Sequence, residues 1–322
     1  MPIKLKAIIT KLLKFATFAL VIVAILPFFS FLIWPLELFS HFYAQYTLIF
    51  LGLAIFWALM KKPYLIVIST IGFMFNFALV LPFYYKPQAI AQPTAEQTQS
   101  FSLVFNNFNY GNTDFKALVN YINQEQPPVV ALVEIPQDHY QEIKELLPNY
   151  PYSFRQPGVN HQLGLVIFSQ KPFVREPYIH HFGDSKYPSV EVNLALLNTP
   201  DLSLIVIHPP PPMTTHLKTE RDQVFTGLAD YLAKKQVRTI VVGDFNSTSW
   251  SPNFRQILTD GKVNDARYGE GVQPSWPTQL PKMLRIPIDH ALVTQDIQVI
   301  NRSLGPNVGS HHLPFSLQVL IP

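Results

Sequence analysis

Several acid, amide and imidazole side chains stand directly after short apolar runs of this sequence. Such runs predict buried strands, and a strand end is where a sheet delivers functional groups to a loop. A single polar residue there is usually a turn or a cap. A repeated set of oxygen and imidazole ligands instead suits a hard divalent cation and a phosphate oxyanion. The set comprises Asn107, Asn109, Glu134, His208, Asp244, Asn246, Asp289 and His312, with His311 directly before the last.

The elements that must position these residues begin at about residue 101, where short β-rich runs alternate with helical patterns. The pattern predicts strands over residues 102–108, 129–134, 164–169, 190–197, 202–208, 239–243, 289–294 and 317–321. It predicts helices over residues 113–124, 138–147 and 215–235. Strands followed by helices in some places and by hairpin-like strands in others indicate a mixed α/β sandwich rather than a TIM barrel.

The N-terminal part of the chain is strongly apolar. Three stretches, Phe15–Trp34, Tyr46–Met60 and Tyr64–Leu81, contain no charged residue. A spanning helix needs about 20 apolar residues, so we expect three transmembrane helices and contact with a lipid bilayer through residues 15–82. A cleaved signal peptide is an alternative for the first stretch, but its apolar core is longer than the usual 7 to 15 residues. A buried hairpin of soluble helices is the other alternative.

Lysines predict the orientation of these helices. Four lysines precede the first stretch and Lys61 and Lys62 follow the second, whereas the loop over 35–45 carries only Glu37 and His41. Basic segments remain in the cytoplasm, so the predicted order is N-terminus inside, then outside, inside and outside. We therefore expect an inner or plasma membrane protein with a periplasmic or extracellular C-terminal domain.

Composition divides the chain into an anchor over 1–85, a polar linker over 86–100 and a domain over 101–322. Of the 24 basic and 21 acidic residues in the chain, seven lysines and one acid lie in residues 1–86, which leaves 17 basic and 20 acidic residues beyond them. This balance, without a basic run, argues against avid binding to duplex DNA. The absence of cysteine excludes disulfides and zinc–thiolate sites.

The motifs along residues 101–322 resemble the endonuclease/exonuclease/phosphatase superfamily, whose members include DNase I-like nucleases, sphingomyelinases and inositol-polyphosphate 5-phosphatases. GDFN at 243–246 is the most specific motif, and SWPT at 275–278 is similar to a "TWP" segment of the family. The resemblance implies a DNase I-like two-sheet α/β sandwich, here preceded by three transmembrane helices as in membrane-anchored bacterial members. The ordered set is Asn107, Glu134, GLVIFSQKP (164–172), His208, GDFN, Asp289-His290 and SHHLP (310–314).

The resemblance also implies which residues bind the metal and activate the attacking water. Glu134 would be the principal ligand of Mg²⁺ or Mn²⁺, with Asn109 or Asn112 near the metal. Asn107 would hold a phosphate oxygen. Asp244 would orient or deprotonate the attacking water.

Further implied roles concern the charge that develops on the phosphate. Asn246 would donate to this charge, and His312 would donate to a phosphate oxygen as an imidazolium, held and made more basic by Asp289. His208 would lie near the scissile phosphate. One departure is His311, because family members usually carry Asp there. A neutral imidazole at the metal would weaken Mg²⁺ binding and favour Mn²⁺.

These observations predict a membrane-anchored, metal-dependent phosphoesterase whose substrate is a lipid headgroup, a small phosphoester or a nucleic acid. A nuclease of the same fold is one alternative. A catalytically inactive membrane-bound binding domain is the other, and His311 is the residue that favours it. Trp276 is either a residue that stacks on a base or lines a headgroup pocket, or a core aromatic. His180 and His181 are either ligands or residues of a polar surface loop.

Overall fold

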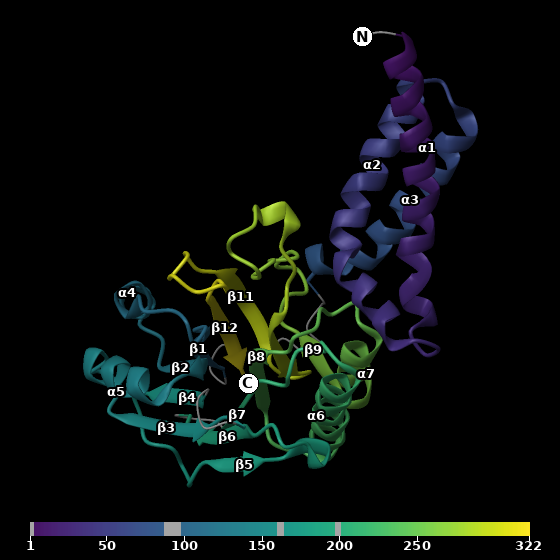
Figure 1. Ribbon diagram of the computed structural model, residues 1–322. Helices are drawn as coiled ribbons and strands as arrows, with labels where there is room; N and C mark the ends of the chain where they lie inside the picture. The colour runs from purple at the N-terminus through teal and green to yellow at the C-terminus, as the bar shows by residue number, and fades with distance from the viewer. Residues whose placement is uncertain (1–2, 87–97, 160–163, 197–200) are drawn as a thin grey trace. The chain divides into compact units, whose positions relative to one another are not determined.

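The computed structural model describes residues 3–86, 98–159, 164–196 and 201–322. The chain divides into two compact units, which are described separately (Figure 1). One unit comprises Met1–Tyr85 and Trp250–Pro252, and the other comprises Lys86–Ser249 and Asn253–Pro322.

The N-terminal unit is helical. Three of its segments are long and apolar enough to cross a membrane: Ala7–Phe29, Trp34–Leu59 and Pro63–Tyr84. The first begins before the predicted Phe15 because its helix continues without a break through Lys11 and Lys14. The helices are α1 (Ile3–Ile25), α2 (Tyr43–Leu59) and α3 (Pro63–Val80), with 3-10 helices η1 (Leu26–Phe29), η2 (Trp34–Phe42) and η3 (Leu81–Tyr84).

Thr17 and Trp57, from two different helices, find polar partners inside the unit. The Trp57 indole donates to Thr17 Oγ1 at 3.0 Å, and the Thr17 hydroxyl donates to the Leu13 carbonyl at 2.8 Å. Trp57 also packs with Leu53 and Leu65. Internal satisfaction of polar groups is what the hydrocarbon region of a bilayer demands.

The second unit contains two six-stranded mixed sheets (Figure 1). The first sheet has the order β11 (Gln298–Leu304), β12 (Phe315–Ile321), β1 (Gln99–Asn107), β2 (Val129–Ile135), β4 (Gly164–Ser169), β3 (Tyr152–Pro157). The second has the order β5 (Tyr178–His180), β6 (Ser189–Leu194), β7 (Leu202–Ile207), β8 (Thr239–Asp244), β10 (Asp289–Thr294), β9 (Val263–Asp265).

Apolar side chains from the inner faces of both sheets form one continuous core. Helices α4 (Phe115–Glu125) and α5 (Gln137–Leu146) bury their apolar faces on the outside of the first sheet. Helices α6 (Thr215–Lys234) and α7 (Pro252–Asp260) do the same on the second. The unit is therefore a four-layered α/β sandwich, and the predicted fold class is confirmed.

The sequence pattern misses β3, β5, β9, β11 and α7. Strands β5 and β9 have three residues each, too few to show a periodicity. The strand predicted over 190–197 ends at Leu194, and Leu197 lies outside the described residues. Most of the predicted linker, residues 87–97, also lies outside them, and Gln99 already pairs with Ile321 in β1.

Strand directions gather the predicted site residues at one edge of the sandwich. Strands β1 and β2 are parallel, as are β7 and β8, so the carboxyl ends of each pair meet. Antiparallel β10 begins at Asp289, directly opposite Asp244 at the end of β8. Antiparallel β12 begins at Phe315, opposite Phe105 near the end of β1.

Candidate active site

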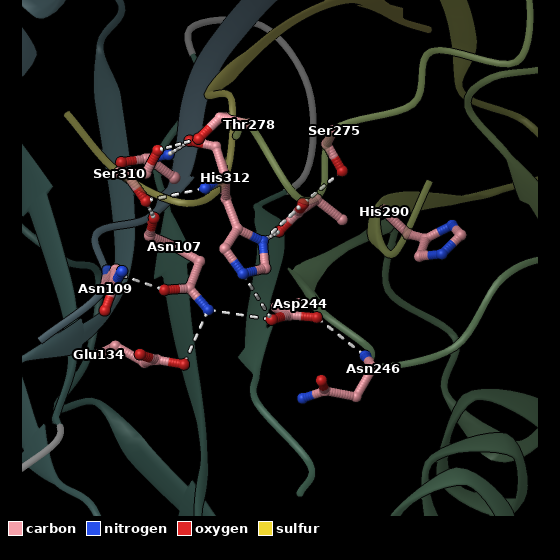
Figure 2. A network of polar contacts seen from close by, with 12 residues as sticks. Asn107, Asn109, Glu134, Asp244, Asn246, Ser275, Thr278, His290, Ser310 and His312 are labelled. Carbon is pink, nitrogen blue, oxygen red and sulfur yellow. Dashed lines mark hydrogen bonds and ion pairs between the residues drawn. The ribbon is translucent and has the colours of Figure 1, made fainter. Parts of the chain in front are cut away.

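The buried amide of Asn107, at the end of β1, joins two carboxylates that come from different sheets. Its Nδ2 donates to Glu134 Oε1 at 3.0 Å and to Asp244 Oδ2 at 2.9 Å (Figure 2). The Asn109 backbone N–H donates to Asn107 Oδ1 at 2.9 Å. Because that bond occupies the oxygen, the amide nitrogen is the atom that faces the carboxylates.

Three residues around this amide adopt left-handed backbone conformations. Glu134 has φ 60°, Asn109 φ 62° and Asn246 φ 49°. At Glu134 the pairing register of β2 and β4 also shifts. A non-glycine residue in this region costs about 1–2 kcal/mol, and such strain persists where the surrounding structure fixes it, commonly at functional sites.

Imidazole groups approach the carboxylates from two directions. His208, after β7, places Nε2 3.4 Å from Glu134 Oε1 and 3.8 Å from Asp244 Oδ2. His312, before β12, places Nε2 3.7 Å from the same Asp244 oxygen. Asp244 therefore lies at the centre of the cluster, and its side chain is almost fully buried.

A carboxylate holds the far side of the His312 ring. His312 Nδ1 lies 3.0 Å from Asp289 Oδ2. The Ser275 hydroxyl donates to the same oxygen, and Arg302 Nη2 donates to the Asp289 carbonyl at 2.9 Å. These contacts fix the position of the pair. They place a proton on Nδ1 and direct Nε2 toward Asp244.

Ser310 ties this pair to Asn107. Its hydroxyl donates to the Asn107 carbonyl at 2.6 Å and accepts from the His312 backbone N–H at 3.0 Å (Figure 2). Sequence reasoning did not assign functional roles to Ser275, Ser310 or Arg302. Ser275 begins the SWPT motif and Ser310 begins the SHHLP motif, whereas Arg302 belongs to no motif.

The environment shifts the pKa values of Asp244 and His312 in directions suited to proton transfer. Burial raises the pKa of Asp244 to about 6, and the charge of Asp289 adds to this against the opposing effect of His312. Burial would lower the pKa of His312, but Asp289 and Asp244 outweigh it and raise that pKa to about 9. The pKa of Asp289 is lowered, because its attraction to His312 and its hydrogen bonds outweigh its burial.

Asn246 lies beside Asp244 on the side away from Asn107. Its backbone N–H donates to Asp244 Oδ1 at 2.8 Å, and its Nδ2 donates to the Pro209 carbonyl at 3.0 Å. The amide is therefore held by the loop that follows His208. Asp244 therefore accepts one hydrogen bond from the Asn107 side chain and one from the Asn246 backbone.

The donor atoms fit a divalent cation. Among the described residues, two groups bring ligand atoms within 4.8 Å of one another: Glu134, His208 and Asp244; and Asp244, Asp289 and His312. Two carboxylates that meet in a buried place, one of them with a raised pKa, carry charge that a hard cation would neutralise. The His312–Asp289 pair already satisfies its own charges, so the first group is the better fit.

The predicted residue His311 belongs to neither group. The His311 side chain is exposed, and its carbonyl accepts from the Thr278 backbone N–H at 2.9 Å. Asn109 Oδ1 accepts from the Gly111 N–H at 3.3 Å. Trp276 is 36% exposed, with its ring 6.3 Å from that of His312, so it lines the surface beside the site.

Solved structures of similar fold come from bacteria and animals. An endonuclease/exonuclease/phosphatase from Beutenbergia cavernae DSM 12333 matches with 16% identity and a TM-score of 0.58, over 69% of this chain and 72% of that one. D. rerio TDP2 humanized by 14 mutations matches with 17% identity and a TM-score of 0.58, over 68% and 98%. D. rerio TDP2 complexed with single strand DNA product matches with 16% identity and a TM-score of 0.56, over 69% and 99%.

At these identities the likeness establishes the fold. No curated protein sequence matches the chain. The pattern of one family does, over residues 104–314, which include the Asn107 amide, both carboxylates and the His312–Asp289 pair. The chain therefore belongs to the Endonuclease/Exonuclease/phosphatase family.

Proposed function

We propose that this protein is a membrane-anchored phosphoesterase that cleaves its substrate with a metal-activated water. The observation that carries the proposal is the convergence of Glu134 and Asp244 on Asn107 Nδ2, with His312 Nε2 3.7 Å from Asp244. A hydrolase of this kind needs a cation ligand, a base and a donor to the phosphate within one small space. Membership of the family supports the same class of reaction.

Glu134 is the residue that we expect to be the principal ligand of Mg²⁺ or Mn²⁺, with Asp244 and His208 close beside it. When bound, the cation would supply Lewis-acid polarisation of a phosphoryl oxygen and lower the pKa of a water molecule. The Glu134 carboxylate is partly exposed and can reach a cation, whereas Asp244 is buried and His208 Nε2 lies 3.4 Å from Glu134 Oε1. We do not expect His311 to contribute a ligand atom, since its side chain is exposed.

Asp244 accepts the proton of the attacking water in this proposal. Its pKa of about 6 keeps it ionised at neutral pH and still close enough in basicity to take a proton. Both N–H groups of the Asn107 amide are used by the two carboxylates. Asn107 therefore orients these carboxylates, and it contacts a phosphate oxygen only by releasing one of them.

His312 donates to the phosphate. Its raised pKa keeps the ring protonated at neutral pH, and Asp289 holds Nδ1–H so that Nε2–H points to the reacting side. Asn246 approaches from the opposite side of Asp244 and donates to charge on phosphorus through its remaining N–H. His208 assists the leaving group.

For the substrate, we favour a lipid or small phosphoester. Residues 87–322 contain more acidic than basic residues, which does not suit a polyanion. The nuclease alternative draws support from the shared fold with TDP2, whose structure holds a single strand DNA product. We keep the division into an anchor (1–85), a linker (86–100) and a domain (101–322), and a non-cytoplasmic domain, as part of the proposal.

The test is hydrolysis by the purified full chain of a chromogenic diester, a monoester, a phospholipid and single-stranded DNA. Each is assayed with Mg²⁺, with Mn²⁺ and with EDTA. We expect metal-dependent turnover that is fastest on the phospholipid or the small esters. Preference for DNA would establish the nuclease instead. A folded protein with no turnover on any ester would favour the inactive binding domain.

Orientation has a separate test, for which the absence of cysteine is convenient. A Tyr178→Cys variant carries its only thiol on exposed β5. An impermeant maleimide added to intact cells or spheroplasts should label it if the domain is outside. Labelling only after lysis would place the domain in the cytoplasm.

A further inference from the structure

The segment between Ser275 and Asp289 carries large apolar side chains on its outside. Met283 is 66% exposed, Leu284 50% and Leu280 41%. They lie in and before the short 3-10 helix η6 (Lys282–Leu284), in the yellow-green loop at the top of the second unit in Figure 1. We call residues 276–286 the tip loop. Single exposed apolar residues are ordinary, but three within five positions form a patch.

The tip loop is folded back on itself, so its apolar residues are held outward. Trp276 and Ile286 close its base by exchanging backbone hydrogen bonds of 3.1 and 2.6 Å. Within it, Arg285 Nε donates to the Leu280 carbonyl at 2.7 Å and Nη2 donates to the Thr278 carbonyl at 2.9 Å. The side chain of Arg285 thereby satisfies backbone groups that no strand or long helix would satisfy.

The base of the tip loop is attached to the candidate active site. The Thr278 backbone N–H donates to the His311 carbonyl at 2.9 Å, and its hydroxyl donates to the Ser310 carbonyl at 2.7 Å. Ser275, directly before the loop, donates to Asp289. A surface that engages the tip of this loop is therefore brought next to the groups that we expect to act on a phosphoester.

The charges of the loop complement an anionic surface. Lys282 and Arg285 flank Met283 and Leu284, and the chain has no acidic residue between Glu270 and Asp289. Apolar side chains flanked by cations are the composition that enters the headgroup region of anionic bilayers, where each cation near the surface adds to the attraction.

We propose that the tip loop docks on an anionic phospholipid bilayer, with Met283 and Leu284 inserted among the headgroups and Lys282 contacting lipid phosphates. A lipid surface is the occupant favoured because three segments of the same chain are long and apolar enough to cross a bilayer, which keeps such a surface at high local concentration. The docking goes beyond the proposed hydrolysis and does not depend on it. If both hold, the loop presents headgroup phosphoesters to the site.

The absence of cysteine makes a direct test simple. The full chain with Met283→Cys is labelled with an environment-sensitive fluorophore and reconstituted into nanodiscs of neutral or partly anionic phospholipid. Some of the lipids carry a doxyl quencher at the headgroup or in the upper acyl chain. The matched control is the label at Tyr178→Cys, which is 62% exposed on β5, at the bottom of the same unit in Figure 1.

We expect quenching and a blue shift at position 283 in anionic discs, less in neutral discs and neither at position 178. With the label moved to Leu280→Cys, the Met283→Ser/Leu284→Ser pair should abolish the quenching. Lys282→Gln should shift the ratio of docked to free loop about fivefold toward the free state. Lys144→Gln on α5 is the charge control and should change nothing.

The proposal is overturned if the probe at 283 is no more quenched in anionic discs than the probe at 178. It is equally overturned if quenching at 283 stays at its anionic-disc value both when the discs are neutral and when Lys282→Gln is introduced. Because quenching is measured without substrate turnover, an inactive but docked protein and an active but undocked one are distinguished. Circular dichroism and thermal melting of each variant verify that the domain remains folded.

Discussion

Two buried carboxylates of the second sheet, Glu191 in β6 and Asp244 at the end of β8, have opposite environments. Glu191 accepts hydrogen bonds of 2.7–2.9 Å from the His180 ring, the Tyr231 hydroxyl, the Lys235 ammonium and the Ser203 hydroxyl. Burial alone would raise the pKa of Glu191, but these bonds and the charge of Lys235 outweigh it and lower the pKa to about 2.

Asp244 accepts its two hydrogen bonds from neutral amides, those of Asn107 and Asn246, while the nearest imidazole nitrogens lie 3.7 and 3.8 Å away. Burial, together with the charge of Asp289, outweighs the opposing imidazoles and raises the pKa of Asp244 to about 6. A carboxylate surrounded by donors stabilises the fold, whereas one left short of donors retains the capacity to bind a cation or accept a proton. The predictions below test whether this difference separates structure from catalysis.

The largest expected effect follows from Asp244→Asn. The asparagine is nearly isosteric but cannot take a proton from water, so kcat should fall about 10³-fold, within the range for general-base catalysis. Thermal stability should stay the same or rise, because a buried charge is removed. Ester hydrolysis and a melting curve of the same sample check both. Unchanged turnover would show that Asp244 is not the base.

The matched substitution Glu191→Gln should have the opposite profile. Losing a buried charge whose partners Lys235 and His180 remain should cost about 3 kcal/mol, or a fall in Tm of roughly 5–10 °C, while kcat stays within about twofold. Because the pKa of Glu191 is lowered in the fold, its contribution is complete above the unfolded value and is lost as pH falls toward 2. The variant should therefore show a smaller loss of Tm between about pH 5 and pH 3. Equal pH dependence in both proteins would contradict this role.

The pH–rate profile should be bell-shaped. Activity needs Asp244 deprotonated and His312 protonated, so it should rise on the acid side and fall on the alkaline side. A bound cation favours the ionised carboxylate and the neutral imidazole, so the two limbs should lie at or below about pH 6 and about pH 9. Asp289→Asn removes the largest contribution that raises the His312 pKa, and the alkaline limb should then move to lower pH. Rates measured from pH 4.5 to 10.5 test this, with Glu191→Gln as the variant that should leave both limbs in place. An alkaline limb unmoved by Asp289→Asn would assign that limb to another group.

The smallest expected effect is that of His311→Asp. Since the His311 side chain is exposed and outside both groups of candidate ligands, restoring the usual acid should change the ratio of Mg²⁺- to Mn²⁺-supported rates by about twofold or less. The ratio is measured at saturating metal. A gain of tenfold or more with Mg²⁺ would instead place position 311 at the cation and restore the sequence-based interpretation.

The positions of Asn107, Glu134 and Asp244 could be anticipated because each follows an apolar run, and parallel strands end at one edge of a sheet. The Glu191 network could not be anticipated in the same way. Its segment SVEVNL is an ordinary strand pattern, and the partners of Glu191 lie 11 to 44 residues away in the chain. Arg302 escapes notice for the same reason, since it lies in β11 of the first sheet and meets Asp289 of the second sheet only when the two sheets pack together.

His311 illustrates a further limit. Its place in the motif predicts a residue at the metal, and this stays a prediction. The side chain is exposed and the carbonyl accepts from the Thr278 backbone N–H. A motif specifies which residues come together, but the direction of each side chain depends on local φ and ψ values that the sequence pattern does not contain.

The most direct test of the proposed phosphoesterase site combines metal binding with turnover in one titration. EDTA-treated full chain is titrated with Mn²⁺, bound ion is measured by electron paramagnetic resonance, and hydrolysis of a chromogenic diester is followed in the same samples. We predict that the rate rises in proportion to bound Mn²⁺, that Glu134→Gln weakens both together, and that Glu191→Gln changes neither. Turnover in the metal-free chain, or full Mn²⁺ binding in folded Glu134→Gln, would contradict the account.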